Sequence, residues 1–230
     1  MKLLSIDTTD NIMDVALSSK GEFISLSEDV RINDYEGIVL LIEKALKKSK
    51  LRLDKIDHFG VCTGPGSFTG IRIGLSVMKA LAYSANKPLI GFNSLDLLAR
   101  IVKDKFSGSL CVIQDAKRKN IYSAIYNKNK NLSRISPYLL VDIDSLLKKI
   151  KALHQKDEDL YFYGNVTLLY QDDIKKLFPN SKILHDSDTK LKAEAIISLT
   201  KHNIIKKSNA FKLLPFYMYP KDCQVSKPIK

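Results

Sequence analysis

A chain of 230 residues, 45% hydrophobic and 27% charged, has the composition of a globular protein and the length of one large domain or two of about 100 residues each. No apolar run approaches the roughly 18 residues that span a bilayer, and Asp7 interrupts the N-terminal apolar stretch too early for a secretory signal. These features exclude a disordered chain and a helical membrane protein, and we expect a cytoplasmic protein with no membrane partner.

The net charge of +12 is concentrated in the second part of the chain. Residues 1–100 carry 13 basic and 12 acidic side chains, whereas residues 101–230 carry 24 and 13. Such asymmetry favours contact with nucleic acid through the second half. However, 31 of the 37 basic residues are lysine, and recognition of phosphates and bases relies more on arginine. Nucleic-acid binding and a general lysine bias therefore both stay open.

The first half predicts an antiparallel three-stranded meander, followed by alternating helices and strands. The three strands are expected at 2–6, 12–18 and 22–27, with Lys20-Gly21 as a hairpin turn. Helices are expected at 38–50, 71–85 and 94–103, and further strands at 57–62 and 88–91. Asn33 or Asp34 is placed to cap the first of these helices.

The same order of elements begins again near residue 109. Strands are expected at 109–114, 120–126, 135–141 and 159–163, and helices at 143–153, 167–178 and 190–206. LLSIDTTDNIMDVAL and LCVIQDAKRKNIYSAIY share one pattern: an apolar strand, an aspartate, a polar turn and an apolar strand. We therefore predict a duplicated α/β fold with lobes at 1–104 and 105–230, each a mixed sheet with flanking helices.

Asp7 and Asp115 each end the first strand of one half. Ligands of α/β proteins favour strand ends beside a cleft. We therefore expect these two carboxylates to face a cleft between the lobes.

Residues 63–74 read TGPGSFTGIRIG and lead from a strand into a helix. Gly64, Gly66 and Gly70 permit positive φ and close backbone approach, and a glycine-rich turn that begins a helix offers N–H groups to an anion. Ser67 or Thr69 can instead cap the helix. The loop lacks the Gly-Lys-Ser/Thr ending of a Walker A motif, and no histidine lies nearby to activate a serine. Anion binding and a tight structural turn remain open, with catalysis least favoured.

Cysteines and histidines show no metal-ligand spacing. Cys62 and Cys111 lie in strand-like runs, which favours buried structural thiols, and Cys223 makes the set odd. The four histidines are scattered and contain no His-x-x-x-His pair. We predict no metal site.

The loop GPGSFTGIRIG after a strand, together with IDTT near the N-terminus, resembles the TsaB family of tRNA threonylcarbamoyladenosine biosynthesis proteins. In the second half, DAKRKNIY at 115–122 is similar to the family's Asp-Ala-Arg stretch before a tyrosine, and LPFYMY at 214–219 to its Pro-x-Tyr-x-Arg tail. The resemblance covers nearly the whole chain. It implies two tandem ribonuclease H-like lobes of the actin/Hsp70-like (ASKHA) kind.

The resemblance also implies a function in forming threonylcarbamoyladenosine beside the anticodon of tRNAs that read codons beginning with A. The family's catalytic relative, the TsaD/Kae-type transferase, has a His-x-x-x-His metal site that this sequence lacks. The chain is thus expected to be a non-catalytic subunit that docks and activates the TsaD-type transferase. A TsaE-type ATPase completes the implied assembly and tRNA binds through the complex. Whether the chain alone is a monomer or a homodimer stays open. No cofactor is expected to bind tightly, and ATP or ADP enters only in the assembled complex.

Helices 38–50 and 71–85 are apolar nearly all the way round, which predicts burial on their own sheet and also against a second protein. Complete burial within their own domain is the alternative. Members of the family pair through these helices, with a relative or a second copy. The predicted interface therefore consists of Ile38, Leu41, Ile42, Ile71, Arg72, Leu75 and Met78.

The cleft is expected to be a weak or vestigial nucleotide site lined by Asp7, Thr8, Gly64, Gly66, Ser67 and Asp115. The alternative to a partner subunit is a stand-alone ATP-dependent small-metabolite kinase of the same fold, with one of the aspartates as its base. Nothing resembles the Ser-His-Asp set of a protease. The sequence departs from the family at residues 31–37, which lack a frequent histidine, and at Tyr219, which stands at the tail arginine.

Overall fold

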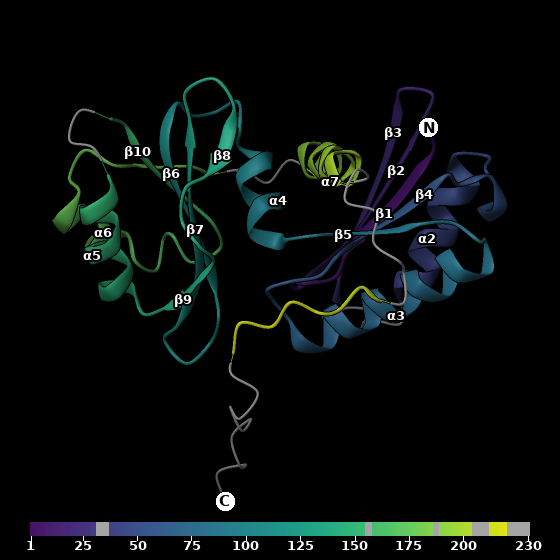
Figure 1. Ribbon diagram of the computed structural model, residues 1–230, viewed down its shortest axis with the longest axis horizontal. Coiled ribbons are helices and arrows are strands. Elements are labelled where there is room, and N and C mark those ends of the chain that lie inside the picture. Colours follow the sequence, from purple (N-terminus) through teal and green to yellow (C-terminus); the bar gives the residue numbers. More distant parts are fainter. Residues whose placement is uncertain (31–36, 155–157, 186–188, 204–211, 220–230) are drawn as a thin grey trace, which may run out of the picture.

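The computed structural model describes residues 1–30, 37–154, 158–185, 189–203 and 212–219. Cys223 and the predicted helix cap at Asn33 or Asp34 lie outside these residues. So does most of the segment 31–37, where the sequence differs from the family pattern. Two sheets lie on either side of a central pair of helices (Figure 1). No helix in the described ranges is long and apolar enough to cross a membrane.

The first sheet has the order β3-β2-β1-β4-β5. Its first three strands form the predicted antiparallel meander, and β1, β4 and β5 run parallel. Their bounds are β1 Leu3–Asp7, β2 Ile12–Ser19, β3 Glu22–Asp29, β4 His58–Cys62 and β5 Leu89–Phe92. All five residues of β1 are buried, because helices cover both faces of the sheet at its centre.

The second sheet repeats the first. It has the order β11-β10-β6-β7-β8, and β9 also pairs with β7. Its strands are β6 Gly108–Asp115, β7 Ile121–Lys128, β8 Leu132–Arg134, β9 Leu139–Val141, β10 Leu160–Tyr163 and β11 Lys182–Ile183. Counted from the first strand of its lobe, the first sheet has the order 3-2-1-4-5 and the second has the order 3-2-1-5-6, with its extra fourth strand β9 paired to β7. Both lobes thus place an antiparallel meander beside parallel strands, and the predicted duplicated α/β fold is confirmed.

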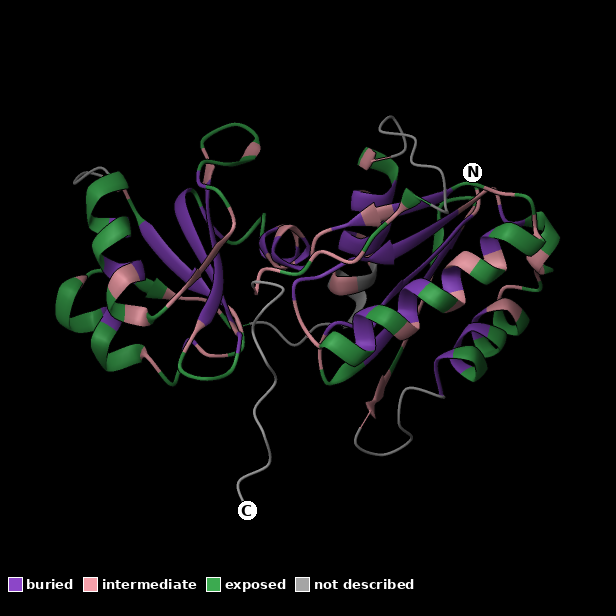
Figure 2. Ribbon diagram, turned by 60° about the horizontal axis from the view of Figure 1, so that its bottom comes forward, coloured by how far each residue is buried: buried purple, intermediate pink, exposed green. Residues whose placement is uncertain are grey.

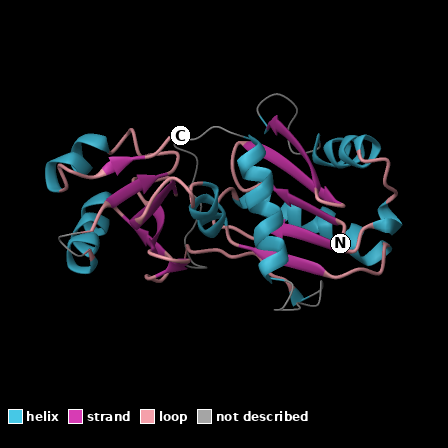
Figure 3. Ribbon diagram, turned by 90° about the horizontal axis from the view of Figure 1, so that it is seen from above, coloured by secondary structure: helices cyan, strands magenta, loops and turns pink. Residues whose placement is uncertain are grey.

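Three layers of helices enclose the two sheets (Figures 1 and 3). The outer layer on the first sheet consists of α2 Gly37–Lys48 and α3 Phe68–Ser84. The central layer, between the sheets, consists of α4 Ser94–Ile101 and α7 Thr189–Asn203. The outer layer on the second sheet consists of α5 Ile143–Leu153 and α6 Gln171–Leu177. A short 3₁₀ helix, η1, spans Leu53–Lys55. One apolar cluster fills each outer layer, and a third fills the central layer.

Two predicted elements of the second lobe differ from the structure. Of the strand predicted at 135–141 only β9, Leu139–Val141, forms, and the separate strand β8, Leu132–Arg134, lies before it. Pro137 lies between the two strands and cannot donate to a ladder. The helix predicted at 167–178 begins only at Gln171. Turns precede it, and in them Thr167 Oγ1 donates to the Gly164 carbonyl at 2.9 Å.

The last helix, α7, packs on the first sheet although it follows the second lobe in sequence. It lies across the strands of that sheet, where Ser5 Oγ and Thr200 Oγ1 are 3.0 Å apart (Figure 3). The division at 104/105 therefore separates the two sheets, but the C-terminal helix returns to the N-terminal one.

Gly60 of β4 lies where α7 comes closest to the sheet. A Cβ atom at this position would be 2.3 Å from Ser5 Oγ and 2.5 Å from Thr200 Oγ1. We predict that Gly60→Val lowers the free energy of unfolding by about 1–3 kcal/mol, because the added side chain forces the helix away from the sheet. Urea unfolding measures this change. Ser133→Val, at an exposed position of β8, is the control and should stay within about 0.5 kcal/mol; equal stability of both variants would contradict this packing.

Candidate functional site

The turn after β1 and the glycine-rich loop pack directly against each other. Ser67 N–H donates to the Thr9 carbonyl at 2.7 Å, and Thr8 Oγ1 donates to the Gly70 carbonyl at 2.7 Å. Gly66 has a φ of +154°, and a Cβ atom there would be 2.2 Å from the Thr9 carbonyl oxygen. A glycine is therefore required at this contact. The structure brings five predicted cleft residues together here: Asp7, Thr8, Gly64, Gly66 and Ser67.

Ser67 is the N-cap of α3. Its Oγ accepts a hydrogen bond from Gly70 N–H at 3.1 Å. This bond satisfies one of the four N–H groups that a helix leaves unpaired at its start. Because its N–H and its Oγ both bond within the protein, Ser67 acts here as a helix cap. Of the alternatives that the sequence left open, the tight turn is the one that these contacts support.

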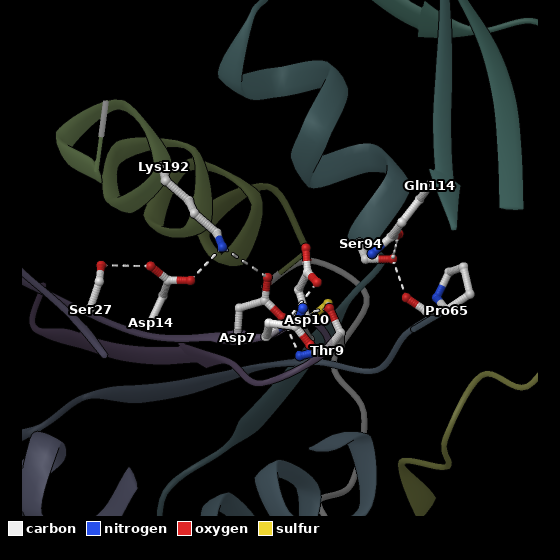
Figure 4. Close-up of polar contacts among 11 residues, drawn as sticks. Asp7, Thr9, Asp10, Asp14, Ser27, Pro65, Ser94, Gln114 and Lys192 are labelled. Carbon is white, nitrogen blue, oxygen red and sulfur yellow. Dashed lines mark hydrogen bonds and ion pairs between the residues drawn. The ribbon is translucent and has the colours of Figure 1, made fainter. Parts of the chain in front are cut away.

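Asp7 and Asp14 are directly opposite each other on the antiparallel strands β1 and β2. Both carboxylates therefore lie on one face of the sheet, and they are only 3% and 4% exposed. Lys192 of α7 lies between them: its Nζ is 3.8 Å from Asp7 Oδ2 and forms a closer ion pair with Asp14 Oδ2 (Figure 4). Burial acts to lower the pKa of Lys192, but the attraction of Asp14 and Asp7 outweighs it and raises that pKa.

Neutral donors occupy the other oxygens of these two carboxylates. Asp7 Oδ1 accepts from Thr9 N–H at 2.9 Å and from Thr9 Oγ1 at 2.7 Å, and Asp14 Oδ1 accepts from Ser27 Oγ at 2.7 Å. Sequence reasoning identified Asp7 but missed Asp14 and Lys192. Asp14 lies on the same face of the sheet as Asp7 because the register pairs these two residues, and the sequence alone did not reveal that register.

Asp115, the predicted counterpart of Asp7, is held within its own turn. It accepts hydrogen bonds from Lys117 N–H at 2.8 Å and from Lys117 Nζ at 2.7 Å. Lys117, Arg118 and Lys119 have φ values of 66°, 54° and 61° and are exposed, so three consecutive basic residues adopt the left-handed conformation. No contact within the described part of the chain joins Asp115 to Asp7.

The lobes meet instead beside this position, at the start of α4. Ser94 Oγ donates to the Pro65 carbonyl and, at 3.4 Å, to Gln114 Oε1 (Figure 4). Asp96 accepts hydrogen bonds from Tyr126 and Tyr138 at 2.8 and 2.7 Å. These contacts join the glycine-rich loop and α4 to the second sheet.

Residues 212–219, which we name the C-terminal strap, connect both lobes across the glycine-rich loop. Phe216 N–H donates to the Thr63 carbonyl at 2.8 Å, and the Phe216 ring contacts Tyr138 of the second lobe with ring centroids 5.3 Å apart. Tyr219 OH donates to the Ala116 carbonyl at 2.8 Å. Tyr219 thus reaches the basic turn 117–119, and the sequence did not indicate this role of the strap.

Six of the seven predicted interface side chains are buried in the protein's own core. Ile38, Leu41, Ile42, Ile71, Leu75 and Met78 are at most 4% exposed. They pack against the first sheet in one apolar cluster, so they leave almost no surface for a second protein. Only Arg72 of this set is exposed, and its Nε donates to Tyr217 OH at 3.0 Å.

Other residues of the same two helices are exposed (Figure 2). On α2, Val39 and Leu40 are 55% and 58% exposed. Along its 17 residues α3 carries only two charged side chains, and its exposed residues are Phe68, Thr69, Arg72, Ser76, Ala80, Tyr83 and Ser84. We name these seven residues the outer face of α3.

The thiols and the metal-binding side chains give no sign of a reactive centre. Cys62 and Cys111 are free and fully buried, as predicted. Burial raises the pKa of Cys111 to about 12 and that of Cys62 well above its usual value. In the described part of the chain, no group of three or more His, Cys, Asp or Glu side chains is arranged to hold a metal ion.

Two duplicated α/β lobes, each with an antiparallel meander followed by parallel strands, and a glycine-rich loop at the start of α3 define a two-lobed protein of the ribonuclease H-like class. Residues 30–211 match the family model described as TsaD, tRNA N6-adenosine threonylcarbamoyltransferase. A tRNA threonylcarbamoyladenosine biosynthesis protein TsaB from Buchnera aphidicola subsp. Acyrthosiphon pisum is 32% identical over 69% of this chain and 70% of its own length. The chain belongs to the TsaB family, which is related to the TsaD transferases.

Longer alignments and a solved structure agree with this assignment. TsaB from Haemophilus influenzae is 25% identical over 95% of this chain and 93% of its own length. The structure of YeaZ from Pseudomonas aeruginosa superimposes with a TM-score of 0.76 over 94% of this chain and 99% of that one, at 20% identity. The likeness to YeaZ establishes the shared fold.

The role of Ser67 can be tested with two substitutions that separate a helix cap from an anion ligand. Ser67→Ala removes the cap and should lower the free energy of unfolding by about 1 kcal/mol. Ser67→Asp keeps a capping oxygen and adds a charge that favours the helix N-terminus, so its stability should equal that of the wild type. Urea unfolding measures both. Equal losses in the two variants would contradict a capping role.

Proposed function

We propose that this chain is a non-catalytic subunit in tRNA threonylcarbamoyladenosine biosynthesis, where it docks and activates a TsaD-type transferase. The observation that carries the proposal is the outer face of α3, which carries one charged residue, together with the exposed Val39 and Leu40 of α2 in the same helix layer. Membership of the TsaB family supports the pathway.

The outer face of α3 has the composition of a helix-packing surface. Ser76 and Ala80 are small and exposed, so a helix of another protein can approach α3 closely along this line. Phe68 and Tyr83, at the two ends of the helix, are 52% and 70% exposed, and aromatic residues frequently anchor interfaces. A surface helix that packed only on its own sheet would carry charged residues here.

The polar residues first considered for catalysis support a non-catalytic role. Asp7 is paired with Lys192, Ser67 caps α3 and Asp115 is held by Lys117. The sequence has no His-x-x-x-His pair. The alternative, a stand-alone kinase, requires an aspartate base that is free to accept a proton from substrate, and no observation favours it.

The remaining partners follow from the same family reasoning and belong to this proposal. A TsaE-type ATPase completes the complex, and ATP or ADP enters only there, so the isolated chain binds nucleotide weakly. Transfer RNA is held by the complex, and the basic turn 117–119, whose three side chains are exposed, is the part of this chain that we propose for contact with its phosphates. A homodimer of the isolated chain uses the outer face of α3, so the second copy and the transferase compete for it.

Leu40→Glu tests the docking surface without disturbing the core, since this side chain is 58% exposed. It should weaken the one-to-one complex with the transferase of the same organism roughly tenfold or more, because a charge becomes buried against an apolar surface. Light scattering of the mixed proteins measures the complex, and light scattering of the chain alone measures the homodimer.

Leu169→Glu is the matched control, because Leu169 is 73% exposed on the second lobe. This variant should form the complex as the wild type does. A complex that survives Leu40→Glu but not Leu169→Glu would move the docking surface to the second lobe and contradict the proposal.

A further inference from the structure

The pair Asp7 and Asp14 requires a positive charge. Carboxylates directly opposite on neighbouring strands repel each other, and here both are almost fully buried. Their hydroxyl and N–H partners are neutral, and burial of an unbalanced charge strongly destabilises a fold. Among the contacts described for these two residues, the cation is Lys192.

Lys192 comes from the far end of the chain to reach this position. It belongs to α7, whose apolar side packs on the first sheet through the central core. Its side chain is 22% exposed and ends between the two carboxylates (Figure 4). The C-terminal helix therefore supplies the ammonium group at the strand end where a ligand was expected.

We propose that Lys192 is a built-in cation that occupies the Asp7–Asp14 site and keeps divalent cations out of it. Two carboxylates on one face make a weak oxygen site for a hard divalent ion, and the ammonium holds the same place with one charge. Occupation by the protein's own lysine also denies the site to a metal–nucleotide complex. This inference does not depend on docking, since Lys192 and the outer face of α3 lie on opposite faces of the first sheet.

Three full-length variants test the proposal with Mn²⁺ as the probe. Lys192→Met removes the charge and keeps an unbranched apolar side chain, Lys192→Arg keeps the charge, and Lys192→Met combined with Asp14→Asn removes one carboxylate as well. The decrease of the free Mn²⁺ signal in electron paramagnetic resonance measures binding and its stoichiometry.

We expect Lys192→Met to bind one Mn²⁺ per chain with a dissociation constant of roughly 10⁻⁴–10⁻³ M, as weak carboxylate sites do. The wild type, Lys192→Arg and the double variant should show no binding in this range. Binding of one Mn²⁺ per chain to the wild type as tightly as to Lys192→Met would overturn the proposal, because the lysine would not then exclude the ion. Equal binding to Lys192→Met and the double variant would also overturn it.

Thermal unfolding with and without Mn²⁺ keeps the test decisive if Lys192→Met is poorly folded. If the ion replaces the ammonium, Mn²⁺ should raise the unfolding midpoint of this variant and leave that of the double variant unchanged. A Lys192→Met protein that Mn²⁺ neither binds nor stabilises would show that the carboxylates accept only the lysine, and the proposal would fail.

Discussion

The close contact between the turn after β1 and the glycine-rich loop positions helix α3 relative to the first sheet. Gly66 lies against the Thr9 carbonyl so tightly that no Cβ atom fits, and Ser67 is tied to the same carbonyl. This contact sets the first turn of α3 at the end of β1. The direction of α3, and therefore the residues that it presents outward, follows from that position. A loop with the composition of a phosphate cradle here acts as the joint between a strand and a helix.

A second constraint comes from the C-terminal segment, which leaves the second lobe and returns to the first. Helix α7 fills the central layer together with α4, and the C-terminal strap contacts the glycine-rich loop, the second sheet and the basic turn. The lobes are therefore connected by α7 and by the C-terminal strap, both of which are distant in sequence from the first lobe. Enzymes that close around a ligand by a hinge motion need lobes that move relative to each other, whereas these contacts favour a fixed arrangement suited to presenting a surface.

Local pattern was enough to predict the meander, most helices and the duplication, because strand alternation and helix periodicity are properties of neighbouring residues. The Ser67 cap was one of the alternatives that local sequence allowed. The pairing of Asp14 with Lys192 was not accessible, since it depends on strand register and on a helix that crosses to the other lobe. The interface prediction selected the apolar residues of two helices, and six of them proved to be buried. Apolar residues on a helix are found mainly in the core of the protein. A docking surface is better predicted from an exposed helix face that has few charged residues.

The proposed docking surface on α3 and the proposed role of Lys192 both depend on which polar groups are already paired within the protein. A carboxylate that acts as a base must be free to accept a proton from substrate. In this chain Asp7, Ser67 and Asp115 all have partners from the protein itself, so the inner polar groups stabilise the fold. The exposed apolar feature lies outside, on the outer face of α3, where Phe68 and Tyr83 are 52% and 70% exposed and Arg72 is the one charged residue. Exposed apolar patches often mark interaction surfaces. The residues that we propose for docking are therefore on the outer surface of the first lobe.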